Sequence, residues 1–322
     1  MSSIQLAADQ LPPAIFLMGP TAAGKTDLAI ELVQQRACEI ISVDSAQIYK
    51  GMNIGSAKPD AATLKTAPHH LINICDPLEA YSVARFRADA LDLMAQITAR
   101  GKVPLLAGGT MMYYKALMDG LATLPASDPA TRQQLEQDID DYGLSAMHLR
   151  LSAIDAESGA RINAADAQRI TRAMEVFLLS GETLTTHWSK QKQQRLPYQV
   201  TSVGVWPAQR SVLHERIEQR FKIMLQQGFK YEVECLIARG DLHLDLPSMR
   251  CVGYRQMWQH LTGVYDYPTM QYKGIVATRQ LAKRQLTWLR SWPDLNIFNS
   301  LDTKLTFKVL QLFDRIEAFA SF

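Results

Sequence analysis

Short, largely apolar runs alternate along the chain with longer stretches in which apolar residues recur every three or four positions. The runs occupy residues 15–18, 39–43, 103–107 and 199–205. A strand without a polar face is typical of a parallel sheet that is covered by helices on both faces. The alternation of such strands with helical patterns therefore predicts an α/β fold with a parallel sheet core flanked by helices.

This alternation stops near residue 121. Pro125 and Pro129 interrupt the pattern, and the helical periodicity that follows includes no good strand before residue 199. We therefore expect three segments. Residues 1–120 form the first part of the core, residues 121–198 form a helical insertion domain, and residues 199–322 complete the core.

The first apolar run leads directly into a phosphate-binding motif. Residues 19–26 match Gly-x-x-x-x-Gly-Lys-Thr, and a helical pattern with Leu28 and Leu32 follows them. A strand, this loop and a helix in succession form the context that a P-loop requires. Its backbone N–H groups and the helix N-terminus bind phosphate, Lys25 reaches the outer phosphate oxygens, and the Thr26 hydroxyl binds Mg²⁺. The predicted phosphate site consists of Gly19, Pro20, Thr21, Ala22, Ala23, Gly24, Lys25 and Thr26.

Two other predicted strands also end in residues that are suited to chemistry. Asp44 follows the run 39–43, and two glycines and Thr110 follow the run 103–107. Ligands of open α/β sheets bind beyond the carboxyl ends of the strands. Asp44 is thus placed to bind Mg²⁺ or to take a proton from a nucleophile, with a helix N-cap as the alternative. The two glycines allow a ligand to approach the backbone closely, or they simply lead into a helix.

Composition narrows the class of protein. The chain has 322 residues, of which 47% are hydrophobic, and a net charge of only +2, so a nucleic-acid surface must be a local patch. Its four cysteines are far apart, which argues against zinc and disulfide frameworks. No window approaches membrane-spanning length. We expect a cytoplasmic protein that is a monomer and has no membrane partner.

Basic and aromatic residues gather near the C-terminal end of the sequence. Between Arg250 and Trp292 there are seven lysines and arginines and one acid, Asp266. On a helix over 275–291, Arg279, Lys283 and Arg290 share one stripe. A basic stripe with aromatic neighbours is typical of an RNA-binding surface, and the alternative is a solvated face over core tryptophans.

Three other arginines lie on predicted helices. Arg169 and Arg172 share the outward face of a helix in the insertion, and Arg220 lies on the helix after the run 199–205. An exposed surface is the plain interpretation of all three. Arg220 also comes near the phosphate loop if the sheet is arranged as in P-loop proteins.

Taken together, these motifs resemble the tRNA dimethylallyltransferase family, which places an isopentenyl group on N6 of the adenosine just 3′ of the anticodon. They keep the family's order and span nearly the whole chain. Ser56 stands where many members have Thr, and Leu281 stands where some have Tyr; neither position carries chemistry. The matching stretches are residues 19–26, 44–49, 55–59, 108–113, 168–172, 250–255 and 283–290.

The resemblance implies a role for each motif. The P-loop would bind the diphosphate of dimethylallyl diphosphate, with Arg220 as an additional contact and Mg²⁺ on Thr26. Lys25, Asp44 and Thr110 would be catalytic, with Asp44 as the base, and the tRNA anticodon stem-loop would be the partner. The resemblance assigns tRNA contact to Asp44, Ser45, Ala46, Gln47, Thr110, Arg132, Gln168, Arg169, Ile170, Thr171, Arg172, Arg250, Cys251, Val252, Gly253, Tyr254, Arg255, Lys283, Arg284, Gln285, Leu286, Thr287, Trp288, Leu289 and Arg290.

Two other classes of enzyme share some of these features. A nucleoside or small-molecule kinase also places an acid after its second strand, but it does not need the basic and aromatic residues of 250–292. A nucleic-acid-stimulated ATPase usually ends an apolar strand in a metal-binding acid, whereas the run 103–107 ends in two glycines.

Overall fold

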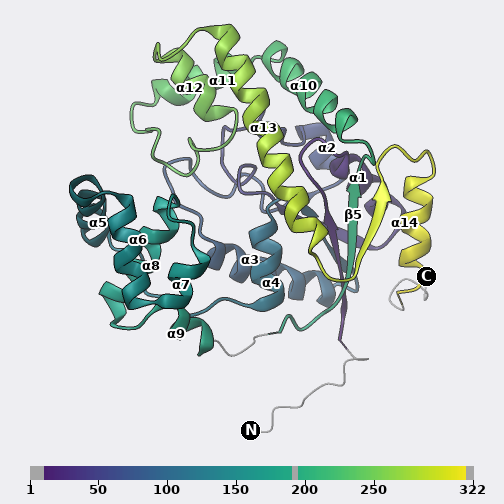
Figure 1. Ribbon diagram of the computed structural model, residues 1–322. Coiled ribbons are helices and arrows are strands. Elements are labelled where there is room, and N and C mark those ends of the chain that lie inside the picture. Colours follow the sequence, from purple (N-terminus) through teal and green to yellow (C-terminus); the bar gives the residue numbers. More distant parts are fainter. Residues whose placement is uncertain (1–10, 191–194, 317–322) are drawn as a thin grey trace. The chain divides into compact units, whose positions relative to one another are not determined.

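A wholly parallel six-stranded sheet with the order β3-β2-β4-β1-β5-β6 forms the centre of the structure (Figure 1). The computed structural model describes residues 11–190 and 195–316. The predicted α/β fold with a parallel sheet is confirmed. The strands are β1 (Pro13–Met18), β2 (Cys38–Val43), β3 (His69–His70), β4 (Val103–Gly108), β5 (Gln199–Trp206) and β6 (Leu295–Asn299).

Both faces of this sheet are covered, which explains why its central strands have no polar face. Ile15 and Leu17 of β1 belong to a buried cluster with α1 (Lys25–Gln35) and α14 (Leu305–Phe313). Phe16 and Met18 point to the opposite face and belong to a second cluster. That cluster includes residues of α3 (Val83–Ala99) and α4 (Met111–Asp119). Alternate residues of one strand therefore stabilise two separate helical layers.

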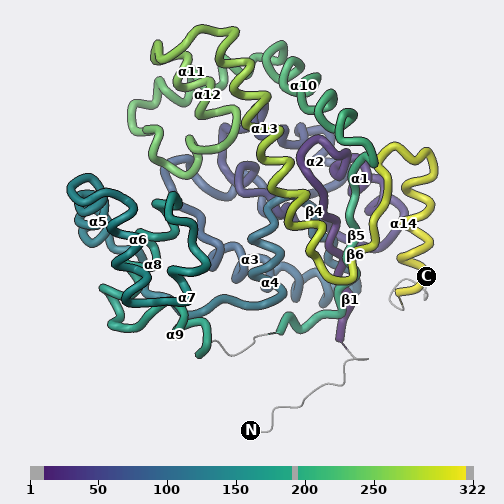
Figure 2. Tube along the Cα trace, in the orientation of Figure 1, coloured from purple at the N-terminus to yellow at the C-terminus, as the bar shows by residue number. Residues whose placement is uncertain are grey.

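Further helices follow β5 and pack against one another. They are α10 (Arg210–Gln226), α11 (Phe229–Ala238), α12 (Tyr254–Leu261) and α13 (Tyr267–Arg290), while the short α2 (Ala61–Thr66) lies earlier in the chain. Figure 2 shows α10 and α13 running beside each other. α13 begins well before residue 275, because Asp266 accepts a hydrogen bond from the Thr269 N–H at 2.9 Å and caps the helix. No helix in the described parts of the chain is long and apolar enough to cross a membrane.

A second compact unit comprises Asp119–Arg195, close to the insertion expected at 121–198. Its described part consists of helices and connections, with a core of its own built from residues such as Leu135, Leu151 and Met174. The larger unit comprises the chain before Asp119 and the chain after Arg195. The helices of the smaller unit are α5 (Pro129–Tyr142), α6 (Leu144–Ile154), α7 (Ala156–Arg161), α8 (Ala167–Ser180) and α9 (Leu184–Ser189).

Two glycines allow the ends of the central strands to approach one another. A Cβ atom on Gly108 would lie 2.1 Å from the Val43 carbonyl oxygen, and one on Gly19 would lie 2.3 Å from the Val205 carbonyl oxygen. The parallel register aligns Gly108 with Val43 of β2 and with Met18 of β1. A side chain at either glycine would push the strand ends apart.

Replacing Gly108 with alanine tests this constraint. We expect Gly108→Ala to lower the free energy of unfolding by about 3 kcal/mol or more, because the new Cβ meets only backbone atoms, which cannot move aside cheaply. Gly240→Ala is the matched control. A Cβ there meets nothing within 4 Å, but φ is +75°, so strain alone should cost about 1 kcal/mol. Urea denaturation of the two variants measures the difference. Equal losses would show that the strand ends can separate freely.

Candidate active site

The loop after β1 has the backbone geometry of an anion-binding loop. Gly24 has a φ of +90° and precedes α1, whose first N–H groups have no side-chain cap. Ala22 adopts a φ of +62°, which costs a residue with a side chain about 1–2 kcal/mol. Strained backbone of this kind persists where the surrounding structure holds it, often at binding sites. The uncapped end of α1 therefore remains available to a negatively charged group.

Lys25 is half-buried in this loop, and its ammonium group donates a hydrogen bond to the Pro20 carbonyl oxygen at 2.7 Å. Burial and, to a smaller extent, the nearby positive charge of Arg220 lower the pKa of Lys25 to about 8, although the Asp44 carboxylate opposes both effects. A cation whose charge is destabilised in this way gains from the arrival of an anion. Lys25 is therefore suited to binding phosphate oxygens.

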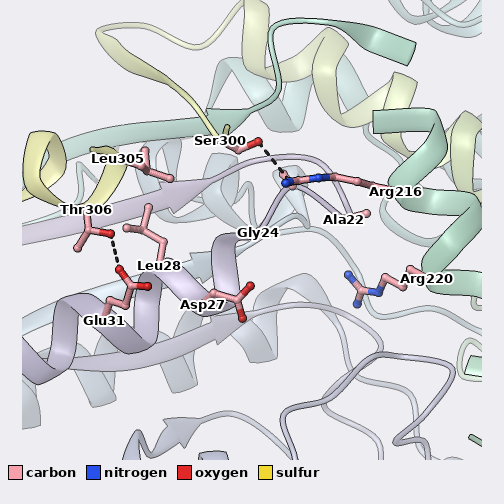
Figure 3. Close-up of a pocket in the computed structure, with 11 residues that line it drawn as sticks. Ala22, Gly24, Asp27, Leu28, Glu31, Arg216, Arg220, Ser300, Leu305 and Thr306 are labelled. Carbon is pink, nitrogen blue, oxygen red and sulfur yellow. Dashed lines mark hydrogen bonds between the residues drawn. The ribbon is translucent and has the colours of Figure 1, made fainter. Parts of the chain in front are cut away.

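A pocket of about 380 Å³ adjoins the loop (Figure 3). Arg216 and Arg220 reach into it from α10, and the loop contributes Ala22 and Gly24. Burial lowers the pKa of Arg220 from its usual value, although the guanidinium remains charged. The expectation that Arg220 lies at the phosphate loop is confirmed. Arg216 was not expected there, although it lies on the same helix face, four residues before Arg220.

Asp44 is held in a fixed orientation by its own turn. Its Oδ1 atom accepts hydrogen bonds from the backbone N–H groups of Ala46 at 2.8 Å and Gln47 at 3.3 Å. The alternative of a helix N-cap is wrong, because a turn and not a helix follows Asp44. This turn uses only one carboxylate oxygen. The other oxygen, Oδ2, makes no hydrogen bond with any described residue. Asp44 is thus oriented and retains an acceptor.

Thr110 lies beside this turn. Its hydroxyl oxygen accepts a hydrogen bond from the Ser45 N–H at 3.1 Å, and its own N–H donates to the Val43 carbonyl at 3.1 Å. The ends of β2 and β4 are joined by these bonds. The side chain of Gln47 points away from this contact, since its amide group donates to the carbonyl oxygens of Ser56 and Ala57.

The motif at 55–59 and the motif at 250–255 meet through Glu232. The Glu232 carboxylate accepts hydrogen bonds from the N–H groups of residues 53–55 and from the Tyr254 hydroxyl, the last at 2.6 Å. The Lys58 ammonium group stabilises the same loop by donating a hydrogen bond to the Tyr49 carbonyl oxygen at 2.6 Å. Glu232 carries no motif signal in the sequence and was not expected to have this role.

The side chain of Gln285 points toward the phosphate loop. Its Oε1 atom accepts from the Thr21 N–H at 2.8 Å, and its Nε2 group donates to the Gly109 carbonyl at 2.9 Å. The same stretch of α13 exposes Lys283, Arg284 and Arg290, none of which has an ion-pair partner among the described residues. The stretch 283–290 therefore contacts the phosphate loop on one face and exposes basic side chains on another.

Arg279 departs from the expected basic stripe. Its guanidinium pairs with Glu218 of α10 at 2.9 Å and is only partly exposed. The positive charge of the stripe is therefore neutralised at Arg279, because the packing of α10 against α13 brings an acid to it.

In the helical unit, Arg132 and Arg172 converge on one carboxylate. Both bind Glu175, whose side chain is 0% exposed and which also accepts from Ser127 and from the Asp128 N–H. Burial alone would raise the pKa of Glu175, but these hydrogen bonds hold it at about 2. Arg132 keeps 47% of its side chain exposed, so the cluster still presents positive charge at the surface of this unit. Glu175 was not expected from the sequence.

Three side chains in the expected tRNA-binding stretches lie in protein cores instead. Ile170 is 0% exposed, and Tyr254 and Leu289 are each 1% exposed. Their role is packing, because they are the inward positions of otherwise surface-facing helices. Arg169 and Arg255 in the same stretches are exposed.

The donors near Thr26 fit a metal that arrives with a ligand. The Thr26 side chain is exposed at the start of α1 and supplies a hydroxyl oxygen. No group of three or more His, Cys, Asp or Glu side chains suited to a metal occurs within residues 11–190 and 195–316. Mg²⁺ keeps several waters and accepts substrate phosphates as ligands, so one hydroxyl is compatible with it.

Two family models match the chain. The model described as IPP transferase matches residues 47–292, and the model described as isopentenyl transferase matches residues 13–74. Together they cover the phosphate loop, the Asp44 turn, the helical unit and the α10–α13 region.

Solved structures of tRNA-modifying transferases are also similar to this chain. A tRNA isopentenylpyrophosphate transferase from Bacillus halodurans is 33% identical, with a TM-score of 0.70 over 96% of this chain and 97% of that one. A tRNA delta(2)-isopentenylpyrophosphate transferase from Staphylococcus epidermidis is 31% identical, with a TM-score of 0.69 over 95% and 99%. A eukaryotic dimethylallyltransferase acting on tRNA shares the fold, with 22% identity and a TM-score of 0.81 over 96% of this chain and 80% of that one. The chain therefore belongs to the IPP transferase family and is an enzyme of the tRNA isopentenyl- or dimethylallyltransferase type.

Proposed function

We propose that this enzyme transfers the dimethylallyl group of dimethylallyl diphosphate to N6 of the adenosine that lies 3′ of the tRNA anticodon. The observation that carries the proposal is the arrangement at the strand ends. A cationic phosphate loop ends β1, and an oriented carboxylate at Asp44 ends β2, with Thr110 bonded to the same turn. One side of the site suits a diphosphate and the other suits a nucleophile that must lose a proton.

In this reaction N6 attacks C1 of the prenyl donor while the C1–O bond breaks, and the bonding electrons leave with the diphosphate. The N–H groups of residues 22 and 24–26, together with Lys25 and Arg220, would stabilise the growing negative charge. Mg²⁺ on the Thr26 hydroxyl would supply additional charge neutralisation to the same oxygens. These donors are fixed before reaction, which is what leaving-group stabilisation requires.

The proton released from N6 would pass to Asp44. Its Oδ1 is engaged by the turn, so Oδ2 is the atom that accepts it. Thr110 and Ser45, which are bonded to each other, would hold the adenine near this oxygen. The target base must leave the anticodon-loop stack to reach the site.

The exposed cations would hold the tRNA. The larger unit exposes Lys283, Arg284 and Arg290 on α13, Arg255 on α12, and Arg250 shortly before α12. In the helical unit we assign phosphate contact to Arg132, Arg169 and Arg172, of which the first and last are oriented by Glu175.

The test of this function is incubation with labelled dimethylallyl diphosphate and unmodified tRNA. Label should enter the RNA, with release of one pyrophosphate for each prenyl group transferred. Conversion of ATP to ADP that responds to a small acceptor but not to dimethylallyl diphosphate would instead identify a kinase.

Asp44→Asn should lower the rate of label transfer about 10²–10⁴-fold, because the amide cannot take the N6 proton. Binding of donor and of tRNA should change little, since the remaining Oδ1 atom can still cap the turn at Ala46. Asp60→Asn is a matched control, because Asp60 caps α2 through a 2.8 Å bond from the Thr63 N–H, and it should retain full activity. Single-turnover kinetics measure the loss. Wild-type turnover by Asp44→Asn would exclude Asp44 as the base.

Affinity for the diphosphate should depend on the charge of Lys25. Its pKa is about 8, so the ammonium form predominates below pH 8 and the proton is lost as the pH rises above this value. Donor affinity should then fall by up to about tenfold per pH unit. Calorimetric titration from pH 7 to 9.5 would show this fall. Lys25→Arg stays charged and reports the ionisation of the ligand alone, so parallel curves for the two proteins would contradict the assignment.

Lys283→Glu should weaken tRNA binding and flatten its dependence on salt. If Lys283 contacts a phosphate, the slope of log K against log salt should decrease in magnitude by about 1. Lys308→Glu on α14 is the control, because α14 packs on the other face of the sheet. Filter binding at several salt concentrations gives both slopes. An unchanged slope for Lys283→Glu would remove this residue from the tRNA interface.

A further inference from the structure

The side chain of Gln285 joins two loops at the carboxyl edge of the sheet. It accepts a hydrogen bond from the Thr21 N–H in the loop after β1 and donates one to the Gly109 carbonyl after β4. The two bonds are 2.8 and 2.9 Å long and use both halves of the amide group. A primary amide is suited to this bridge because it presents an acceptor and a donor side by side.

The space for this bridge exists because residue 109 is glycine. A Cβ atom at Gly109 would lie 2.4 Å from Nε2 of Gln285 and 3.2 Å from the Gly19 carbonyl oxygen. Gln285 is therefore inserted between two backbone segments, in a gap that no other residue at 109 would leave. This glycine was expected either to let a ligand approach or to lead into a helix. Its neighbour in the structure is Gln285.

We propose that Gln285 is a positioning residue that holds the phosphate loop in its diphosphate-binding conformation, an inference that rests on the proposed function. The loop contains the strained Ala22 and the left-handed Gly24, so an external hold lowers the cost of keeping it ordered. Gln285 also occupies the Thr21 N–H, and the Ala23 N–H donates to the Pro20 carbonyl at 3.3 Å, so the N–H groups that remain for the diphosphate are those of residues 22 and 24–26. In this proposal Gln285 acts through the loop, in place of the tRNA contact that the family resemblance implies for it.

The placement of α13 does not depend on this bridge. Ala282 and Leu289 are each 1% exposed and Ile275 is 8% exposed, so the helix is anchored by apolar burial on both sides of Gln285. Removing the amide should therefore leave the fold intact and change the loop alone.

The experiment measures binding of inorganic pyrophosphate, with MgCl2 and without tRNA, by calorimetry. Gln285→Ala should weaken this binding about tenfold, because two hydrogen bonds no longer hold the loop. Gln285→Glu keeps the acceptor for Thr21 but loses the donor and adds a negative charge, so it should weaken binding further. Gln280→Ala is the matched control, because Gln280 is an exposed glutamine on the same helix, and its affinity should equal that of the wild type.

Binding of tRNA to the same variants separates this role from RNA contact. Gln285→Ala should bind tRNA as tightly as the wild type, and the KM for the donor should rise while the KM for tRNA stays constant. Normal pyrophosphate affinity combined with weakened tRNA binding would overturn the inference and leave the proposed function standing. A wild-type protein that binds no pyrophosphate would instead overturn the proposed function. Thermal unfolding checks that each variant is folded, and a loss of fold in both Gln285 variants would also contradict a role limited to the loop.

Discussion

The site depends on how closely the backbones of β1, β2 and β4 approach one another where they end. In the register of the sheet, Met18, Val43 and Gly108 form one row, and the positions of Gly19 and Gly108 have no room for a Cβ atom. The proposed catalytic residues Lys25, Asp44 and Thr110 follow shortly after this row in the sequence. The phosphate loop, the Asp44 turn and Thr110 are placed by the pairing of strands, which is among the stiffest features of a fold.

The charges on the two sides of this row differ, because cations lie on the side of the phosphate loop and the Asp44 carboxylate lies on the other side. The loop side gathers Lys25, Arg216 and Arg220, and burial lowers the pKa of Lys25 and of Arg220. The Asp44 carboxylate favours the charged forms of Lys25 and Arg220. Only its Oδ1 atom is hydrogen-bonded to its own turn. Asp27 of α1 also favours the charged form of Arg220 and lines the same pocket, so carboxylates keep these partly desolvated cations charged and able to bind an anion.

The sequence predicted the parts of this arrangement that depend on local pattern. The apolar runs identified β1, β2, β4 and β5, and the glycine spacing identified the phosphate loop. It did not predict β6, because Leu295–Asn299 is a half-exposed edge strand with polar residues among its apolar ones. It also did not predict the partners of Gln285, Arg279, Arg132 or Arg172. Those partners are set by packing between segments far apart in the chain, as when Thr21 meets Gln285, and no local pattern encodes such a meeting.

The order of strands in the sheet has a consequence for synthesis on the ribosome. β1 lies between β4 and β5, so one of its edges is paired as soon as β4 has emerged. The other edge stays unpaired until the ribosome has synthesised all of Asp119–Arg195 and then β5. During that interval the nascent chain carries a wholly apolar strand with one unpaired edge, which is a template for aggregation. The helical unit has a core of its own, so its folding does not need β5. The late synthesis of β5 therefore makes this interval the one in which the nascent chain is most exposed to aggregation.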